Sequence, residues 1–277
     1  MAVLKALRQT PVALLHNPVV FVPILVLMLL QLPQLLLQAV DPLLASVVSL
    51  GISLLLVVLV PFFQGGIVGM ADEALDGETS FGSFVREGRS NYVSLLVVYL
   101  VILALNFAVG IFGFFVLVFG GLALFAGGAG GTGGGPGIAV LAVVGLVVGL
   151  FVLAYLVFAL FVQFYGQAIV VDDLGAVEGI KRSVSVVRTH FVSTLGYSVL
   201  VGVIGLLAGG VFALATALVS TQSATSPAHV PIPHLSPAAA VGVGLAVLAL
   251  GTLFGGFFGV YSVAFYREIA PPVDGSA

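Results

Sequence analysis

The stretch Asp172–Phe191, DDLGAVEGIKRSVSVVRTHF, decides how the rest of this chain is read. It lies between two long apolar runs and holds three of the chain's eight basic residues. We expect Val177 and Val184 on one stripe of a helix, and Lys181 and Arg188 on another. The pattern predicts an amphipathic helix in the membrane interface, with its apolar side in lipid and its basic side toward lipid phosphates.

The composition makes the bilayer the solvent of this chain. Its 277 residues are 61% hydrophobic and only 7% charged, whereas soluble domains are about 25% charged. A soluble chain this apolar would have too little polar surface to cover itself. A net charge of -3 without a dense basic patch excludes nucleic acid as a partner. The absence of cysteine excludes disulfides and thiolate metal sites, and no residue pattern implies a cofactor or a metal.

Six apolar runs are long enough to cross about 30 Å of hydrocarbon, which takes roughly 20 helical residues. They cover residues 19–39, 43–63, 93–118, 138–165, 192–219 and 237–265. We therefore expect an all-α integral membrane protein with six transmembrane helices in a single domain over residues 1–277. The third run continues to residue 126, so its helix either tilts or breaks near Gly120 and extends past the hydrocarbon.

The basic residues all fall on one side of the six predicted spans. They are Lys5, Arg8, Arg86, Arg89, Lys181, Arg182, Arg188 and Arg267. Lys and Arg accumulate in the cytoplasmic loops of membrane proteins. We therefore expect a multi-pass protein of the cell membrane with both termini in the cytoplasm.

Two loops on this side predict short interfacial helices, at residues 79–91 and 173–190. A shift of 99 residues places Arg89 over Arg188, and the N-terminus matches the same pattern more faintly. We infer three internal repeats, each made of one interfacial amphipathic helix followed by two spans.

Four motifs carry a resemblance to a known family. They are PFFQGG (Pro61–Gly66), MADEALDGETSF (Met70–Phe81), REG (Arg86–Gly88) and NYVSLL (Asn91–Leu96). Through them the chain resembles a family of uncharacterised six-span integral membrane proteins from halophilic archaea, to which no activity is assigned. The resemblance implies a six-span membrane fold and carries over no functional residues.

The loop helix shows a more distant similarity. Its pattern is similar to the membrane domain attached to glycerophosphoryl diester phosphodiesterases. The matching residues are Ala176, Ile180, Lys181, Arg182, Ser183 and Val187. The catalytic domain of those enzymes has no counterpart here, so the similarity implies membrane architecture and no phosphodiesterase chemistry.

Amides are the notable polar groups of the spans, which hold no Asp, Glu, Lys or Arg near mid-membrane. Gln31, Gln34 and Gln38 share one face of the first span. Asn106 lies midway along the third. These four form a candidate intramembrane polar cluster that would line a passage or a small-molecule site. The structural alternative is hydrogen bonding between helices, with a contribution of roughly 0.6–2 kcal/mol each.

A glycine stripe in the last span predicts close helix packing. Gly251, Gly255 and Gly259 recur every four residues, so they share one face of the helix. The spacing suits packing within one chain or a homo-oligomer formed through these glycines, and it does not distinguish the two.

Acidic side chains gather near the end of the second span. Asp72, Glu73 and Asp76 fall within one helical turn, which brings their carboxylates near one another. They would either bind a divalent cation or form the solvated end of a helix, and we favour the solvated helix end.

Two functions remain open for this sequence. The first is a non-enzymatic, membrane-organising or lipid-interacting protein whose partners are membrane lipids. Its contacts with lipid headgroups or a cytoplasmic partner would be Lys181, Arg182, Arg188, Arg86 and Arg89. The alternative is a transporter or channel for a small neutral or lipidic solute, lined by the amides. A lipid-directed enzyme ranks below both, because no nucleophile, metal set or acid–base pair is evident.

Overall fold

The computed structural model describes residues 2–38, 42–129, 138–219 and 237–271, and these are helical with no strand among them. The first elements are α1 (Ala2–His16), a short 3-10 turn (Pro18–Val20), α2 (Phe21–Gln38) and α3 (Pro42–Asp76). There follow α4 (Phe81–Ser90), α5 (Tyr92–Ala129), α6 (Ile138–Val162) and α7 (Tyr165–Val171). The last are α8 (Ala176–Thr189), α9 (Phe191–Val219) and α10 (Pro237–Ile269).

Among the described residues, five helical stretches are long and apolar enough to cross a membrane. They are Leu43–Asp76, Tyr92–Leu122, Ala142–Val171, Phe191–Leu214 and Val241–Ile269. A sixth is obtained if Ala2–His16 and Pro18–Gln31, which are bent by 94° at their junction, are counted as one broken span. The predicted all-α membrane fold is therefore confirmed, with five to six candidate spans.

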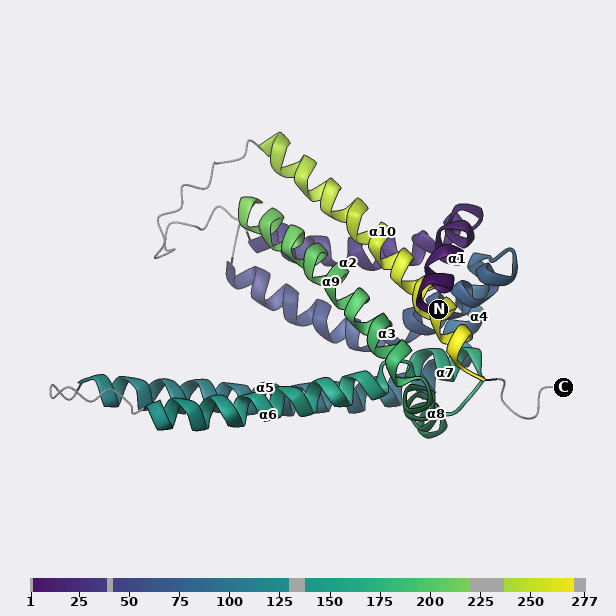
Figure 1. The fold of residues 1–277 in the computed structure, drawn as a ribbon. Helices are drawn as coiled ribbons and strands as arrows, with labels where there is room; N and C mark the ends of the chain where they lie inside the picture. Colours follow the sequence, from purple (N-terminus) through teal and green to yellow (C-terminus); the bar gives the residue numbers. More distant parts are fainter. Residues whose placement is uncertain (1, 39–41, 130–137, 220–236, 272–277) are drawn as a thin grey trace.

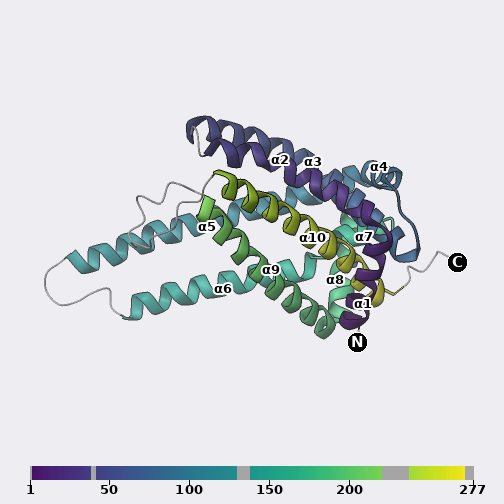
Figure 2. The same cartoon turned by 90° about the horizontal axis from the view of Figure 1, so that it is seen from above.

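The short helices gather at one end of the molecule. In Figure 1, α1, α4, α7 and α8 lie together near the start of α1 and the end of α10, while the long helices extend away from them. The α5–α6 pair diverges from the other long helices, as Figure 1 shows, and Figure 2 gives the same helices from above. The order of one short helix followed by two long helices occurs three times, with α7 as an extra element. Common descent of the three units stays a prediction.

The bend between α1 and α2 follows from the dipeptide Asn17-Pro18. Proline lacks a backbone N–H and its ring disfavours the helical conformation of the residue before it. Asn17 accordingly leaves the helical region, with φ −126° and ψ 64°. The chain turns there, and α1 lies against α10 and α3 instead of continuing the line of α2.

The helix α3 continues well past the predicted span, from residue 63 to Asp76. Hydropathy marks where the hydrocarbon ends, whereas the helix ends only where its backbone hydrogen bonds stop. The extension places the acidic turn of α3 beside the short helices, where it meets arginine side chains.

The helices α4 and α8 occupy the two segments predicted to be interfacial, but their apolar faces are oriented differently from the prediction. Phe84 of α4 is 3% exposed and packs edge-on against Phe62 and Phe63 of α3. Val187 of α8 is fully buried in a cluster with Phe164. An amphipathic pattern shows that one face of a helix needs an apolar environment, but it does not distinguish lipid from protein. In α4 and α8, other helices of the protein cover most of the apolar face.

Close approach of α3 and α4 depends on glycine. A Cβ added at Gly66 would lie 2.3 Å from the Phe84 ring and 2.6 Å from its backbone oxygen. A Cβ added at Gly88 would lie 2.8 Å from the backbone oxygen of Phe62. The PFFQGG and REG motifs are therefore complementary contact surfaces of these two helices.

The glycine stripe of α10 is also used inside the chain. A Cβ added at Gly255 would lie 2.8 Å from Ile24 of α2, and one added at Gly259 would lie 3.2 Å from Ile67 of α3. Gly251 similarly faces Met28 and Phe212. These three glycines therefore pack against helices of the same chain, one of the two uses that their spacing allows. Whether the protein is an oligomer stays a prediction.

We predict that Gly66→Ala destabilises the protein, because its methyl group would overlap Phe84. The cost should be about 1–3 kcal/mol, as for other overpacked sites, and should lower the midpoint of thermal unfolding in mild detergent. The matched control is Gly51→Ala in the same helix, where nothing lies within 4 Å of the new methyl group. Equal stability of the two variants would contradict the predicted contact.

Candidate functional site: the charged end

The region called here the charged end consists of α1, α4, α7 and α8 with the last turns of α3 and α10. It contains every Lys and Arg of the chain. They lie in α1 (Lys5, Arg8), α4 (Arg86, Arg89), α8 (Lys181, Arg182, Arg188) and α10 (Arg267). The one-sided distribution seen in the sequence thus becomes a single surface at one end of the helices (Figure 1).

Asn17 joins the bend after α1 to the loop that follows α3. Its side chain is buried, and its amide nitrogen donates to the backbone oxygens of Ala13 at 3.0 Å and Gly77 at 2.8 Å. Its amide oxygen accepts a hydrogen bond from the backbone N–H of Thr79 at 2.9 Å. Two of these hydrogen bonds join the end of α1 to the backbone of the loop after α3, so Asn17 fixes α1 across the ends of the long helices.

Arginines neutralise the acidic turn of α3. Arg267 of α10 donates to both carboxylate oxygens of Asp76, at 2.8 and 3.0 Å, and lies 3.5 Å from Asp72. Arg86 of α4 pairs with Glu73 and, at 3.0 Å, with Glu87. The three acidic residues therefore form ion pairs that connect α3 to α4 and α10.

Arg182 belongs to a partly buried network, which departs from its predicted contact with lipid. Its Nε donates to Asp172 at 2.8 Å, and the side chains are only 17% and 12% exposed. The same Asp172 oxygen accepts a 2.6 Å hydrogen bond from Tyr266 of α10, and Arg182 also donates to the backbone oxygen of Pro271. Burial opposes the charge of Arg182, but the hydrogen bond to Asp172 and the negative charge of that carboxylate, together with smaller effects of Tyr266, raise the pKa of Arg182 above the ordinary arginine value. Arg182 thus ties α8 to α10.

Four basic side chains form no ion pair among the described residues. They are Arg8, Arg89, Lys181 and Arg188, and all four are exposed. The predicted contact set of α4 and α8 is thereby divided. Arg86 and Arg182 hold helices together, whereas Arg89, Lys181 and Arg188 remain available to a partner.

The structure does not bring together the described members of the predicted amide cluster. Asn106 of α5 accepts a 2.7 Å hydrogen bond from Tyr155 of α6 and donates to the backbone oxygen of Ile102. Gln31 lies on α2, which packs on α3 and α10, and no hydrogen bond between described residues joins it to Asn106. The side chains of Gln34 and Gln38 lie outside the part of the chain that the structure describes.

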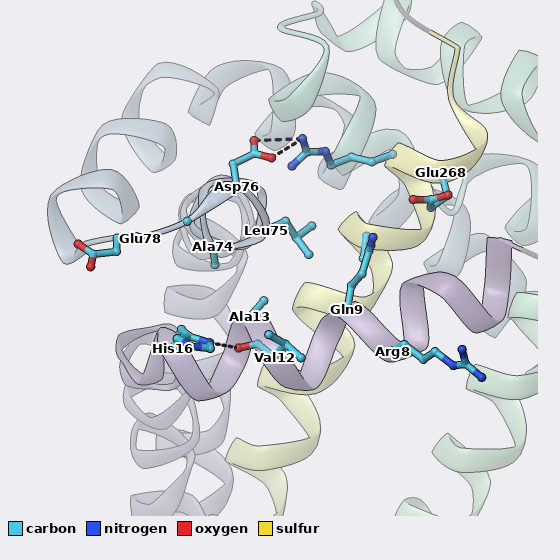
Figure 3. Close-up of a pocket in the computed structure, with 13 residues that line it drawn as sticks. Arg8, Gln9, Val12, Ala13, His16, Ala74, Leu75, Asp76, Glu78 and Glu268 are labelled. Atoms are coloured by element: carbon cyan, nitrogen blue, oxygen red, sulfur yellow. Dashed lines mark hydrogen bonds and ion pairs between the residues drawn. The ribbon is translucent and has the colours of Figure 1, made fainter.

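A pocket of about 710 Å³ opens between α1 and the last turns of α3 and α10 (Figure 3). Its polar lining includes Gln9, Asp76, Glu268 and Arg267, while Val12 and Leu75 are among its apolar residues. In Figure 3, Gln9 points from α1 into the space below the Asp76–Arg267 ion pair, whereas Arg8 points away from it. A pocket of this volume lies in the range of small-molecule sites.

Sequence reasoning missed this pocket, the Asn17 hydrogen bonds and the network around Asp172. The Asn17-Pro18 dipeptide was the available signal for a break before the first span. Nothing local to Asp172 indicates Tyr266 as its partner, because the two are 94 positions apart in the chain. The pocket depends on α1 folding back, which no apolar run encodes.

We predict that Arg182→Gln destabilises the protein by about 3 kcal/mol, because it leaves Asp172 partly buried without its cation. Thermal unfolding in mild detergent measures the effect, and Lys181→Gln serves as the exposed neighbouring control. In a protein that already carries Asp172→Asn, the further change Arg182→Gln should reduce the free energy of unfolding much less than it does in the unaltered protein. A Lys181→Gln loss as large as that of Arg182→Gln would rule out the assigned network.

Comparisons with known proteins place the whole described fold in a family. No curated protein and no solved structure matches the chain. The sequence model of a domain of unknown function, DUF7847, matches residues 1–269. This match agrees with the predicted resemblance to an uncharacterised family, whereas a halophilic source and the similarity to phosphodiesterase membrane domains stay predictions. The chain, a multi-pass membrane protein by the length and hydropathy of its helices, therefore belongs to the DUF7847 family.

Proposed function

We propose that this protein is a non-enzymatic, lipid-interacting membrane protein whose charged end binds anionic lipid headgroups at the cytoplasmic face. The observation that supports the proposal is the exposed stripe of α8. Val177, Lys181 and Arg188 are spaced by four and seven residues, so they lie within about 40° of one another around the helix. All three are exposed.

The opposite side of α8 supports the same orientation. Gly179, Ser183, Val186 and Val187 are buried against the rest of the protein, so the basic stripe must face outward. Val177 is 57% exposed and lies beside the cations, not on a separate stripe. A surface that presents an apolar side chain next to ammonium and guanidinium groups suits the junction of acyl chains and phosphates.

The expected attraction is modest for each base and additive for a cluster. A Lys or Arg near an anionic bilayer surface contributes about 1 kcal/mol. Lys181 and Arg188 together should therefore contribute about 2 kcal/mol, which is roughly 30-fold in affinity. Arg89 of α4 and Arg8 of α1 add exposed bases on neighbouring helices of the charged end.

A non-enzymatic role is favoured by the partners of the carboxylates. Asp72, Asp76 and Asp172 pair with arginine, an arrangement that holds helices together instead of activating a nucleophile. The predicted solute pathway receives no comparable support, because Asn106 bonds to Tyr155 and not to the amide of Gln31. We therefore propose only the lipid-interacting function.

The experiment is quantitation by mass spectrometry of lipids that co-purify with the full chain in mild detergent. The variant Lys181→Gln/Arg188→Gln should retain at most half of the anionic lipid that co-purifies with the unaltered protein. The amount of bound anionic lipid should also depend less on salt concentration in this variant. The control Glu178→Gln removes an exposed carboxylate from the same helix and should keep or raise the anionic fraction. An anionic lipid content unchanged in the double variant would refute the proposal.

A further inference from the structure

We propose that the α5–α6 hairpin is movable and closes against α9, which extends an existing contact between α6 and α9 along both helices. In the described arrangement α6 and α9 meet near the charged end and diverge away from it (Figure 1, Figure 2). The facing sides of the two helices match each other in register, in size and in hydrogen-bonding groups. Neither the family match nor the proposed lipid contact on α8 assigns a movement to this hairpin.

A hydrogen bond joins α6 to α9 at the end where they meet. Ser198 of α9 donates to the amide oxygen of Gln163, the residue after the end of α6, at 3.0 Å. The chain runs toward this contact in α6 and away from it in α9, so the helices are antiparallel. If they lay side by side, each residue before Gln163 would face the residue that follows Ser198 by the same number of positions.

The side of α9 that bears Ser198 continues as a row of glycines. Gly202, Gly205 and Gly209 follow Ser198 by four, seven and eleven positions, which places them within about 40° of it around the helix. All three are exposed, and a Cβ added at any of them would meet nothing within 4 Å. This side of α9 therefore has room for a second helix.

The corresponding side of α6 combines large and small residues. Leu156 and Val152 precede Gln163 by seven and eleven positions, and Gly149 and Gly145 lie farther along the same side. Leu156 is 58% exposed and Val152 is 48% exposed. A Cβ added at either glycine would again meet nothing within 4 Å, so this side of α6 is as open as that of α9.

The two sides are complementary in size. In the antiparallel register set by Gln163 and Ser198, Leu156 lies opposite Gly205. Val152 lies opposite Gly209 in the same register. Each large side chain of α6 thus meets a glycine of α9, and small residues let helices approach closely in a membrane. Acyl chains impose no register between two helices, so the match favours protein contact.

Two buried polar atoms near the existing contact are also complementary. Nε2 of Gln163 and Oγ1 of Thr194 have no hydrogen-bond partner among the described residues. Thr194 is fully buried and lies one turn before Ser198 on the same side of α9. An amide nitrogen donates and a hydroxyl oxygen accepts. A buried donor and a buried acceptor without partners favour the closer approach of α6 and α9 that joins them.

The end of α6 is the pivot for this movement. Gln163 and Phe164 form a turn between α6 and α7. Ser183 of α8 holds the turn in place, because its hydroxyl donates to the backbone oxygen of Phe161 at 2.8 Å and accepts from the N–H of Phe164 at 3.2 Å. Residues 142–161 of α6 include no buried residue. The helix is therefore fixed at one end and free of deep packing over this length.

The helix α5 moves together with α6. The ring centres of Phe112 and Phe151 lie 4.2 Å apart, and Tyr155 donates to the amide oxygen of Asn106 at 2.7 Å. These contacts join the two helices away from the charged end. The movement is therefore that of a hairpin, and it leaves the hydrogen bond between Tyr155 and Asn106 intact.

Disulfide formation in native membranes tests the closure, because the chain has no cysteine of its own. A disulfide requires two Cβ atoms about 3.5–4.5 Å apart, whereas nothing lies within 4 Å of a Cβ at Gly209 in the described arrangement. The double variant Val152→Cys/Gly209→Cys should form a disulfide within one chain when the hairpin closes, roughly tenfold faster than Leu153→Cys/Gly209→Cys. Leu153 is the matched control because it points about 100° away from Val152 around α6.

Three outcomes would overturn the proposal. Equal rates in the two double variants would show that no register is selected. The absence of any disulfide would show that lipid keeps the helices apart. A disulfide between two chains, seen at twice the mass on a denaturing gel, would show that a second copy covers these sides.

A bulky residue in the glycine row tests the contact by an independent route. Gly205→Phe introduces a ring where the described arrangement has open space, so the protein should fold as before. In the closed arrangement the ring would overlap Leu156, and disulfide formation by Val152→Cys/Gly209→Cys should slow roughly tenfold. Gly210→Phe is the matched control, since Gly210 is equally open but lies on another side of α9. Equal slowing by both variants would contradict the proposed contact.

The closure is separable from the lipid contact on α8. Lys181 and Arg188 take no part in it, so Lys181→Gln/Arg188→Gln should leave the rate of disulfide formation unchanged. Failure of the disulfide test would therefore refute the closure and leave the proposed lipid contact untouched.

Discussion

A charged side chain finds no ion-pair or hydrogen-bond partner in lipid hydrocarbon. This constraint determines where the charged residues of the chain lie. Its Lys and Arg residues lie in α1, α4, α8 and the last turn of α10, and these segments meet at one end (Figure 1). Away from that end, polar side chains bond to a neighbouring helix, as Tyr155 does to Asn106, or to the backbone of their own helix, as Thr252 does to Leu248. The charged end therefore holds the ion pairs and the Asn17 hydrogen bonds, while the other halves of the long helices expose apolar side chains.

The same constraint separates bases that hold the fold from bases that are free to bind. Arg182 and Arg267 meet carboxylates because α8 and α10 bring them to Asp172 and Asp76. Lys181 and Arg188 lie on the exposed side of α8 and meet no carboxylate among the described residues. The pocket beside α1 lies on other helices of the same end, and its carboxylates Asp76 and Glu268 are paired with Arg267 and Lys5. One end of the molecule thus presents a cationic stripe and an ion-paired pocket on different helices.

The sequence was sufficient for the features that hydropathy and charge encode: the helical membrane fold, the one-sided bases and the existence of α4 and α8. It was insufficient where the partner is distant in the chain. The apolar face of α8 has the same sequence pattern whether lipid or Phe164 covers it. The spacing of Gly255 is likewise the same whether it faces Ile24 or another subunit. Asn17 bonds to Thr79 across 62 positions, so a local pattern could indicate the bend but not the contact that fixes it.

The measurement that tests this account most directly is the membrane sidedness of the charged end. The chain has no cysteine, so a single cysteine can be introduced at each of the exposed positions Leu15, Ser90 and Ser185. Each of these three variants can then be probed with a membrane-impermeant thiol reagent. The account predicts that all three react in inside-out vesicles and none reacts in intact cells. Reaction of any one of them from the side opposite to the others would show that α1, α4 and α8 do not share one face of the membrane.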